Sequence, residues 1–112
     1  MASTNPYIQV TSAQYAIAAK FIFNGTSLLG IPTNIKVSYQ VQNSSYPASI
    51  KLYDITNKTT IVEKTGLTST AETIVDLGAL SNLPASQAVF ELQMKTTSSY
   101  IWVRASSLTM EF

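Results

Sequence analysis

Few side chains in this 112-residue sequence could do chemistry, because it contains neither histidine nor cysteine. Without histidine there is no imidazole base, and a Ser-His-Asp triad cannot be built. Without cysteine there is no thiolate nucleophile and no cysteine-based zinc site. Carboxylates, hydroxyls, lysines, tyrosines and a single arginine remain. These residue types favour a structural or binding role over an enzyme, and we expect no cofactor.

The carboxylates show no spacing that selects a catalytic pair. The six are Asp54, Glu63, Glu72, Asp76, Glu91 and Glu111. A glycosidase needs two carboxyl groups about 5 Å or 6.5–9.5 Å apart, and nothing in the sequence singles out two of them. Asp54 and Asp76 could ligate calcium with loop carbonyls, but the sequence has no Asp-x-Asp-x-Asp loop. We therefore expect no catalytic residue and no metal site, and a turn role for Asp54.

Tyrosine and tryptophan are the candidate binding residues. Their rings combine a flat apolar face with a polar tip, which suits sugar stacking and protein interfaces. Tyr46 lies in a predicted loop, while Tyr100 and Trp102 share one face of a predicted strand and could form an aromatic platform with Tyr53. The alternative is that Trp102 belongs to the core and the tyrosines surround it, because aromatic residues dominate ordinary β cores.

Charged residues make up only 12% of the chain, and the formal net charge is +1. Such a chain has no long-range field, and its lysines and arginine are scattered singly, so we expect no nucleic-acid binding. Ser and Thr contribute 14 residues each, which gives a polar but nearly uncharged surface. A neutral surface lowers the barrier to self-association. The expected partners are copies of the same chain or other structural subunits, with glycans as a further option.

The N-terminal residues Met1–Pro6 contain no basic segment followed by an apolar one, so we expect no signal peptide. No run approaches 18 apolar residues, and we expect no membrane insertion. The protein is therefore expected to be made in the cytoplasm. A virion protein is also made there, inside its host cell, and leaves with the particle.

Apolar and polar residues alternate with a period of two through most of the sequence. In residues 35–42, Ile35, Val37, Tyr39 and Val41 fall on one face, which predicts a half-buried strand. The same reasoning predicts strands at 7–10, 49–55, 60–64, 72–77, 88–95, 100–104 and 106–112. Phe112, if it is the natural end, is expected to pack into the core.

Residues 14–23 are the ambiguous segment. Their alanines favour a helix, whereas the odd-numbered residues from Tyr15 to Phe23 alternate as in a strand. The all-β context favours the strand. A short helical turn could fit within residues 77–83.

Eight or nine predicted strands without β-α-β alternation predict a single all-β domain over residues 1–112. We expect an antiparallel β-sandwich of the jelly-roll type. Seven strands would suit an immunoglobulin-like sandwich, but its cysteine and core tryptophan pattern is missing. One predicted hairpin and the closing strands resemble those of small jelly-roll modules in viral and phage structural proteins and in carbohydrate-binding domains. They are Ala48–Asn57 with Thr60-Ile61, then Phe90–Lys95, Tyr100–Val103 and Ala105–Met110.

This resemblance implies a fold, and fold alone does not fix function. Composition favours a non-enzymatic structural protein that self-associates, such as a capsid, decoration or fibre-type component of a virus or phage. Loops at 43–47 and 65–70 are expected to face neighbouring copies. The alternative is a carbohydrate-binding β-sandwich module that uses Tyr46, Tyr53, Tyr100 and Trp102.

Overall fold

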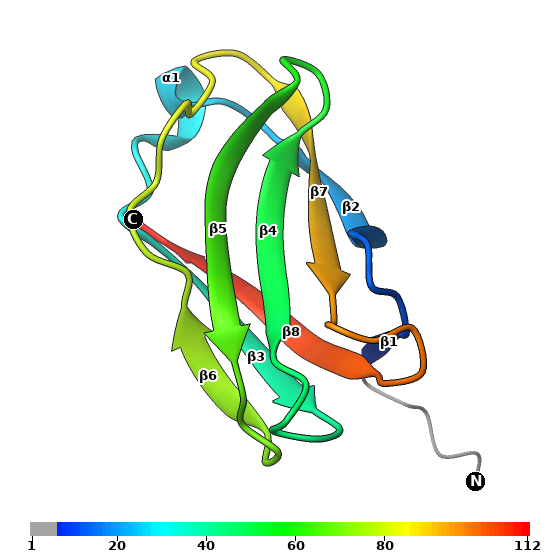
Figure 1. The fold of residues 1–112 in the computed structure, drawn as a ribbon. Helices are drawn as coiled ribbons and strands as arrows, with labels where there is room; N and C mark the ends of the chain where they lie inside the picture. Colours follow the sequence, from blue (N-terminus) through cyan, green and yellow to red (C-terminus); the bar gives the residue numbers. More distant parts are fainter. Residues whose placement is uncertain (1–6) are drawn as a thin grey trace, which may run out of the picture.

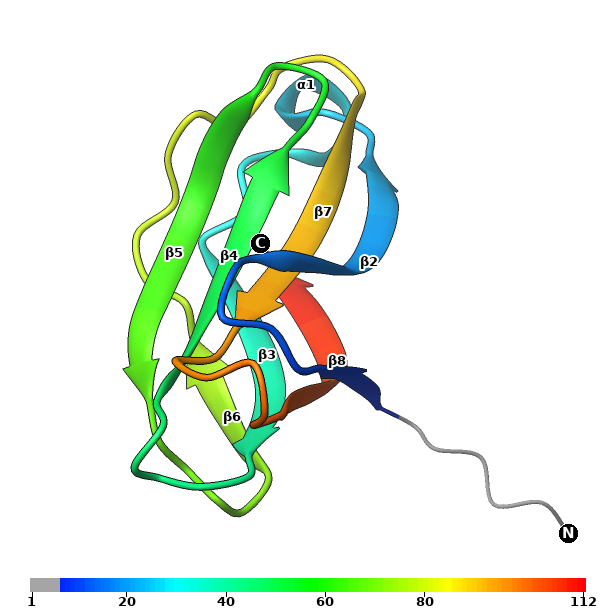
Figure 2. The same ribbon diagram turned by 45° about the vertical axis from the view of Figure 1, so that its right-hand side comes forward.

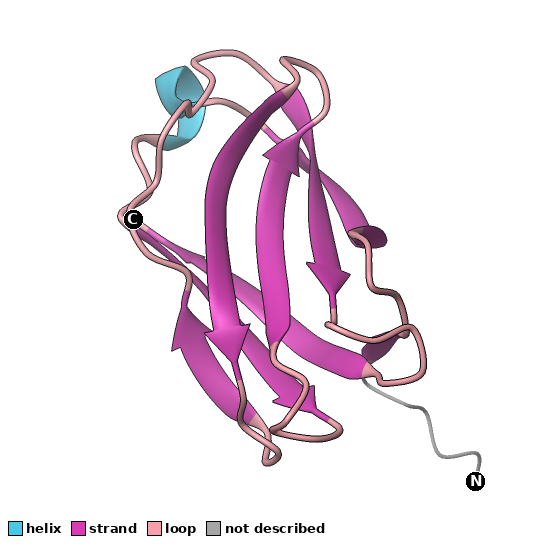
Figure 3. Ribbon diagram, in the orientation of Figure 1, coloured by secondary structure: helices cyan, strands magenta, loops and turns pink. Residues whose placement is uncertain are grey.

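The computed structural model describes residues 7–112, which form two antiparallel four-stranded sheets packed face to face (Figure 1, Figure 3). Sheet A has the strand order β1-β8-β3-β6, and sheet B has the order β2-β7-β4-β5. The predicted all-β sandwich is confirmed. The elements are β1 Ile8–Val10, β2 Ala16–Phe23, α1 Thr26–Leu29, β3 Asn34–Val41, β4 Ala48–Asp54, β5 Thr59–Leu67, β6 Thr73–Asp76, β7 Ala88–Lys95 and β8 Val103–Glu111.

The core lies between the sheets and is built from alternate residues of their strands. Val37 of β3 and Leu52 of β4 are fully buried, as the period-two pattern predicts. Phe90 of β7 is also fully buried and stacks on Phe23 of β2, with ring centres 4.9 Å apart. Burial of a side chain of this size stabilises the fold by about 1.5–3 kcal/mol. The hydrophobic effect therefore determines which face of each strand points into the core.

The ambiguous segment at 14–23 is a strand over Ala16–Phe23, in agreement with the favoured prediction. Its residues pair with β7 from Ala16–Met94 to Phe23–Ala88, with an irregularity between Ile17 and Ala19. The segment leading into β2 crosses the outer face of sheet B (Figure 2). Tertiary pairing with β7 thus overrides the helix preference of the alanines.

The loop predicted at 65–70 begins too early, because β5 continues to Leu67. Ala48 pairs with Leu67 and Ile50 with Lys64, so the ladder bulges at these residues. Gly66 has a φ of 70°, which a residue without a Cβ adopts at little cost. Here the glycine marks a bulge within a strand and does not end it.

The C-terminal segment contains one strand, where two were predicted. Residues 100–102 precede the strand, and β8 runs without interruption from Val103 to Glu111. Phe112 is 60% exposed, so its expected place in the core is wrong. Glu111 pairs with Asn34 as the last residue of the ladder, and Phe112 lies beyond it. No strand pairing holds the final ring against the core.

One four-residue helix occurs in residues 7–112, at a place where the sequence pattern predicts no element. Helix α1 spans Thr26–Leu29, immediately after Gly25. The helical turn predicted within 77–83 is wrong, because these residues have no helical structure. The described residues include no helix that is long and apolar enough to cross a membrane.

Candidate functional site

The outer face of sheet A carries a row of polar side chains over β3 and β8. Alternation along β3 turns Ser38 and Gln40 away from the core. On β8 the ladder skips Ser106, because Ser38 pairs with Ser107 and the next residue of β3 pairs with Ala105. A bulge of this kind re-aims a side chain. Ser106 lies two residues after Arg104, and its hydroxyl lies near that of Ser38, because both bond to the same carboxylate oxygen.

Glu72 lies directly before β6 and is held by these two serines. Its Oε1 accepts hydrogen bonds from Ser106 Oγ and from Ser38 Oγ, the latter at 3.0 Å. The bond from Ser106, followed by that from Ser38, lowers the pKa of the Glu72 carboxyl from its ordinary value of 4.5. Glu72 is therefore ionised at neutral pH. Its other oxygen, Oε2, accepts no hydrogen bond from residues 7–112.

Arg104 of β8 is the only arginine of the sequence, and aromatic rings hold its guanidinium. The guanidinium carbon lies 3.8 Å from the ring centre of Trp102 and 4.2 Å from that of Tyr7. Its Nε donates a hydrogen bond of 2.9 Å to Gln9 Oε1. Arg104 forms no ion pair with the described residues, and residues 1–6 contain no carboxylate side chain. Within residues 7–112, its terminal NH₂ groups donate no hydrogen bond.

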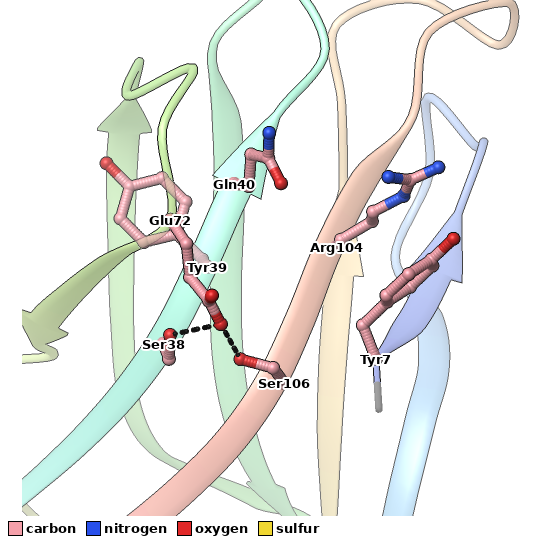
Figure 4. A pocket seen from close by; sticks show the side chains of 7 residues that line it. All are labelled: Tyr7, Ser38, Tyr39, Gln40, Glu72, Arg104 and Ser106. Carbon is pink, nitrogen blue, oxygen red and sulfur yellow. Dashed lines mark hydrogen bonds between the residues drawn. The ribbon is translucent and has the colours of Figure 1, made fainter. Parts of the chain in front are cut away.

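Glu72 and Arg104 line the same pocket, whose volume is about 100 Å³. Figure 4 shows Glu72 with its two serines on one side and Arg104 with Tyr7 on the other. The lining residues are Tyr7, Ser38, Tyr39, Gln40, Glu72, Arg104 and Ser106. The lining of this small concavity thus includes a carboxylate, a guanidinium, an amide and two tyrosines. This combination can bind a polar ligand through both donors and acceptors.

A second pocket, of about 230 Å³, opens between the two sheets beside β1. Its walls are mostly apolar and include Ala19 and Leu92 from sheet B and Leu108 from sheet A. Tyr7 lines both pockets. Strand β1 is only three residues long, so it covers little of the space between the sheets at this edge.

The structure does not bring the four predicted aromatic residues into one platform. Tyr100 is 89% exposed and lies with half-buried Trp102 in the loop before β8. Tyr46 is exposed in the loop after β3, and this loop adjoins that of Trp102 because Gln42 N donates a hydrogen bond to the Trp102 carbonyl oxygen. Tyr53 belongs to β4 of sheet B, whereas Trp102 leads into β8 of sheet A. The Tyr53 ring instead lies 5.5 Å from Lys51 Nζ.

The other carboxylates each have a partner within the fold. Asp54 accepts hydrogen bonds from Asn57, as expected for a turn residue, and Asp76 Oδ1 accepts one from Gly78 N. Glu91 forms an ion pair with Lys20. Glu111 likewise pairs with Lys36, and Glu63 accepts a hydrogen bond from Tyr15. Within residues 7–112, no group of three or more Asp or Glu side chains could hold a metal ion.

Tyr15 attaches the segment that leads into β2 to the outer face of sheet B. Its hydroxyl donates to Glu63 Oε2 on β5, and its ring lies under Lys51 Nζ at 4.2 Å and Lys95 Nζ at 4.7 Å. Burial, followed by the hydrogen bond and the negative charge of Glu63, raises the pKa of the Tyr15 phenol well above its ordinary value. The phenol therefore stays protonated at neutral pH. Its contacts with Glu63, Lys51 and Lys95 hold the segment before β2 against sheet B.

A group of exposed apolar residues lies on α1, on the segment that follows it and at the C-terminus. It consists of Leu28, Leu29, Ile31 and Phe112, which are 76%, 44%, 71% and 60% exposed, respectively. The C-terminus lies close to the segment after α1 (Figure 1), because Thr33 N donates a 2.7 Å hydrogen bond to the Glu111 carbonyl oxygen. We refer to these four residues as the end patch.

The sequence interpretation missed Tyr7, Glu72 and Arg104. One signal for Arg104 was present, since Trp102 and Arg104 are two residues apart and so fall on one face of the strand predicted at 100–104. Their contact is therefore readable from spacing. The approach of Glu72 to Ser106 depends on the pairing of β3 with β8 and on the bulge, neither of which has a local signal.

No protein-family model matches the sequence, and no curated protein or solved structure is significantly similar to it. The function must therefore be argued from its own residues.

Proposed function

We propose that this protein is a non-enzymatic structural subunit that self-associates through the end patch. The patch itself carries the proposal, because Leu28, Ile31 and Phe112 expose most of their surface to water. Burying apolar surface is favourable by about 25 cal/mol per Å². A single exposed apolar residue is ordinary, but a cluster of large ones is typical of an interaction site.

A second copy of the protein is the occupant that fits the patch best. Residues 21–35, which include three of its four members, contain no charged side chain. The centre of a protein interface is depleted of charge, and burying neutral groups avoids the cost of removing ions from water. Because the net charge is +1, two copies approach one another with little repulsion. Glu111, which precedes Phe112, is paired with Lys36, so these two side chains present no net charge to a strongly acidic or basic partner.

The strand order supports assigning the sandwich to the jelly-roll type. The first strand pairs with the eighth in sheet A, and the second pairs with the seventh in sheet B. Consecutive strands from β1 to β4 thus alternate between the sheets, as expected when a long antiparallel ribbon is rolled into two Greek keys. Jelly rolls serve in viral capsid and lectin domains. We therefore propose a capsid, decoration or fibre-type component of a virus or phage, located in the virion.

The engagement of the carboxylates supports a non-enzymatic role. Asp54 is fully buried in its turn, and Glu91 is nearly so beside Lys20. Hydrolysis with two carboxylates requires a pair that faces one substrate. The pocket on sheet A has a single carboxylate, that of Glu72, among its lining residues.

The test is the solution mass of the purified protein, measured by light scattering over a wide concentration series and followed by electron microscopy. We expect a discrete oligomer or a regular particle. Leu28→Asp combined with Ile31→Asp should shift it to monomer, because burying two carboxylates in an apolar contact is strongly unfavourable.

Ile74→Asp is the matched control. Ile74 is 69% exposed on β6, so it resembles Ile31 in exposure but lies outside the end patch. This variant should keep the wild-type mass. The proposal fails if the wild-type protein stays monomeric throughout, or if the oligomer survives both aspartates at the end patch.

A further inference from the structure

We infer that the pocket on the outer face of sheet A binds a neutral saccharide between the Glu72 carboxylate and the Arg104 guanidinium. The inference is independent of self-association, because the pocket shares no residue with the end patch. It also moves carbohydrate binding away from the predicted aromatic platform. Trp102 keeps a part, as the ring that supports Arg104, whereas Tyr53 lies on the other sheet.

Charge selects the class of ligand. Glu72 contributes one negative charge and Arg104 contributes one positive charge, so the pocket is neutral overall. A phosphate or carboxylate ligand would meet the ionised Glu72, and a cationic ligand would meet Arg104. Sugar hydroxyls both donate and accept, so one hydroxyl of a ring can donate to the carboxylate while another accepts from the guanidinium. A neutral polyol therefore satisfies both groups.

The polar groups are fixed before a ligand arrives. Two serine hydroxyls hold Glu72, while the Trp102 and Tyr7 rings and the Gln9 amide hold Arg104. Gln40 Nε2 donates a 2.9 Å hydrogen bond to the Thr70 carbonyl oxygen, which fixes a third pocket side chain. Figure 4 shows Gln40 on β3, across β8 from Arg104. Pre-organised side chains lose little freedom on binding, which favours a specific polar site.

The volume limits the ligand to a small one. At about 100 Å³ the pocket is smaller than the typical drug-sized site of about 300–1,000 Å³. We therefore expect it to take one sugar residue at the end of a glycan. With roughly twelve non-hydrogen atoms of modest efficiency, such a residue should bind with a Kd on the order of a few mM. Several copies on one assembly would raise the overall affinity.

A nuclear magnetic resonance titration with methyl glycosides tests the site directly. The probes are the methyl glycosides of glucose, galactose, mannose and N-acetylglucosamine, with N-acetylneuraminic acid and inorganic phosphate as anionic probes. The protein has one arginine and one tryptophan, so the Arg104 Nε–H and Trp102 indole N–H signals are unambiguous. We expect at least one methyl glycoside to shift both signals with saturation below about 100 mM.

Three variants decide the outcome. Glu72→Gln and Arg104→Met should each weaken the glycoside at least about tenfold, because each removes one charged hydrogen-bond partner. Glu111→Gln is the matched control. Glu111 is another carboxylate on the same sheet, but it pairs with Lys36 and lies outside the pocket, so this variant should bind the glycoside as the wild type does. Amide spectra establish that each variant is folded. If the Glu72→Gln variant is not folded, the affinity of the Arg104→Met variant, measured through the Trp102 indole signal, tests the inference instead.

The inference is overturned if no methyl glycoside shifts either signal. It is also overturned if Glu72→Gln and Arg104→Met bind as the wild type does. Binding of phosphate or N-acetylneuraminic acid alone, strengthened by Glu72→Gln, would identify an anion site in its place. The solution mass of each variant, measured in parallel, separates loss of the pocket from loss of assembly.

Discussion

Asp54 shows how a residue suited to chemistry can serve structure. Its side chain is fully buried, although it is the last residue of β4 and leads into a turn. The carboxylate accepts a hydrogen bond from Asn57 N at 3.0 Å and another from Asn57 Nδ2 at 2.7 Å. The next residue, Lys58, has a φ of 56°, a conformation that only a well-held turn maintains in a residue with a Cβ. Asp54 therefore fixes the connection between β4 and β5.

Replacing Asp54 should destabilise the fold without affecting either proposed site. For Asp54→Ala we expect a loss of roughly 1–3 kcal/mol in the free energy of unfolding, because a buried acceptor disappears and its donors lose their partner. Asp76→Ala is the matched control. Asp76 also accepts a hydrogen bond from a backbone N–H, but it is exposed, so water can accept that bond when the carboxylate is removed. It should change stability by less than about 0.5 kcal/mol. Urea unfolding measures both, and equal losses would refute a special role for Asp54.

At the scale of elements, α1 depends on a close approach to the loop before β7. Thr26 N and Ser27 N donate hydrogen bonds to the Pro84 and Ala85 carbonyl oxygens, at 3.0 and 3.2 Å. Gly25 permits this approach, because a Cβ there would lie 2.3 Å from Ala85 O. Its φ of 90° is also a conformation that favours glycine. The position of α1, and with it the end patch, therefore depends on one residue without a side chain.

Gly25→Ala should lower the free energy of unfolding more than Gly30→Ala does. The difference between the two losses measures the steric overlap of the new Cβ with Ala85. The two glycines have φ values of 90° and 89°, but a Cβ on Gly30 would meet no atom within 4 Å. We expect a loss of about 1–2 kcal/mol from backbone strain in both variants. Overlap with Ala85 should add about 1–3 kcal/mol in Gly25→Ala alone. Thermal and urea unfolding provide the comparison, and similar losses would show that α1 can shift away from this loop.

The sequence predicts strands well where one face of a strand is buried, and poorly where an element begins or ends. Alternation identifies β3 and β7 because Val37 and Phe90 must face the core while their neighbours face outward. It wrongly divides β8, because the bulge at Ser106 interrupts the period without interrupting the pairing. Helix α1 is missed, since its hydrogen bonds go to a loop some sixty residues away. The Glu72 side of the pocket is missed for the same reason, as strand register has no local signal.

At the scale of the whole molecule, the side chains leave a wide pH interval without charge changes. The sequence has no histidine, so no side chain has an ordinary pKa between those of the carboxylates and the phenols. Hydrogen bonds from Ser106 and Ser38 lower the pKa of Glu72, and Lys36 with Asn34 lowers that of Glu111. These contributions to stability are present above the ordinary value of 4.5 and are lost as pH falls through it. Tyr15 has the opposite sign, because its pKa is raised from 10.0.

The free energy of unfolding should therefore be nearly constant from about pH 6 to about pH 9 and fall on both sides. On the alkaline side, Tyr15 stays protonated in the folded state, while the unfolded protein loses that proton above about pH 10, so rising pH favours unfolding. Urea unfolding in a series of buffers measures the profile. Tyr15→Phe should flatten the alkaline fall, and Glu72→Gln with Glu111→Gln should flatten the acid one. A steep change between pH 6 and 8 would contradict this account, because a group other than these three would then control the fold.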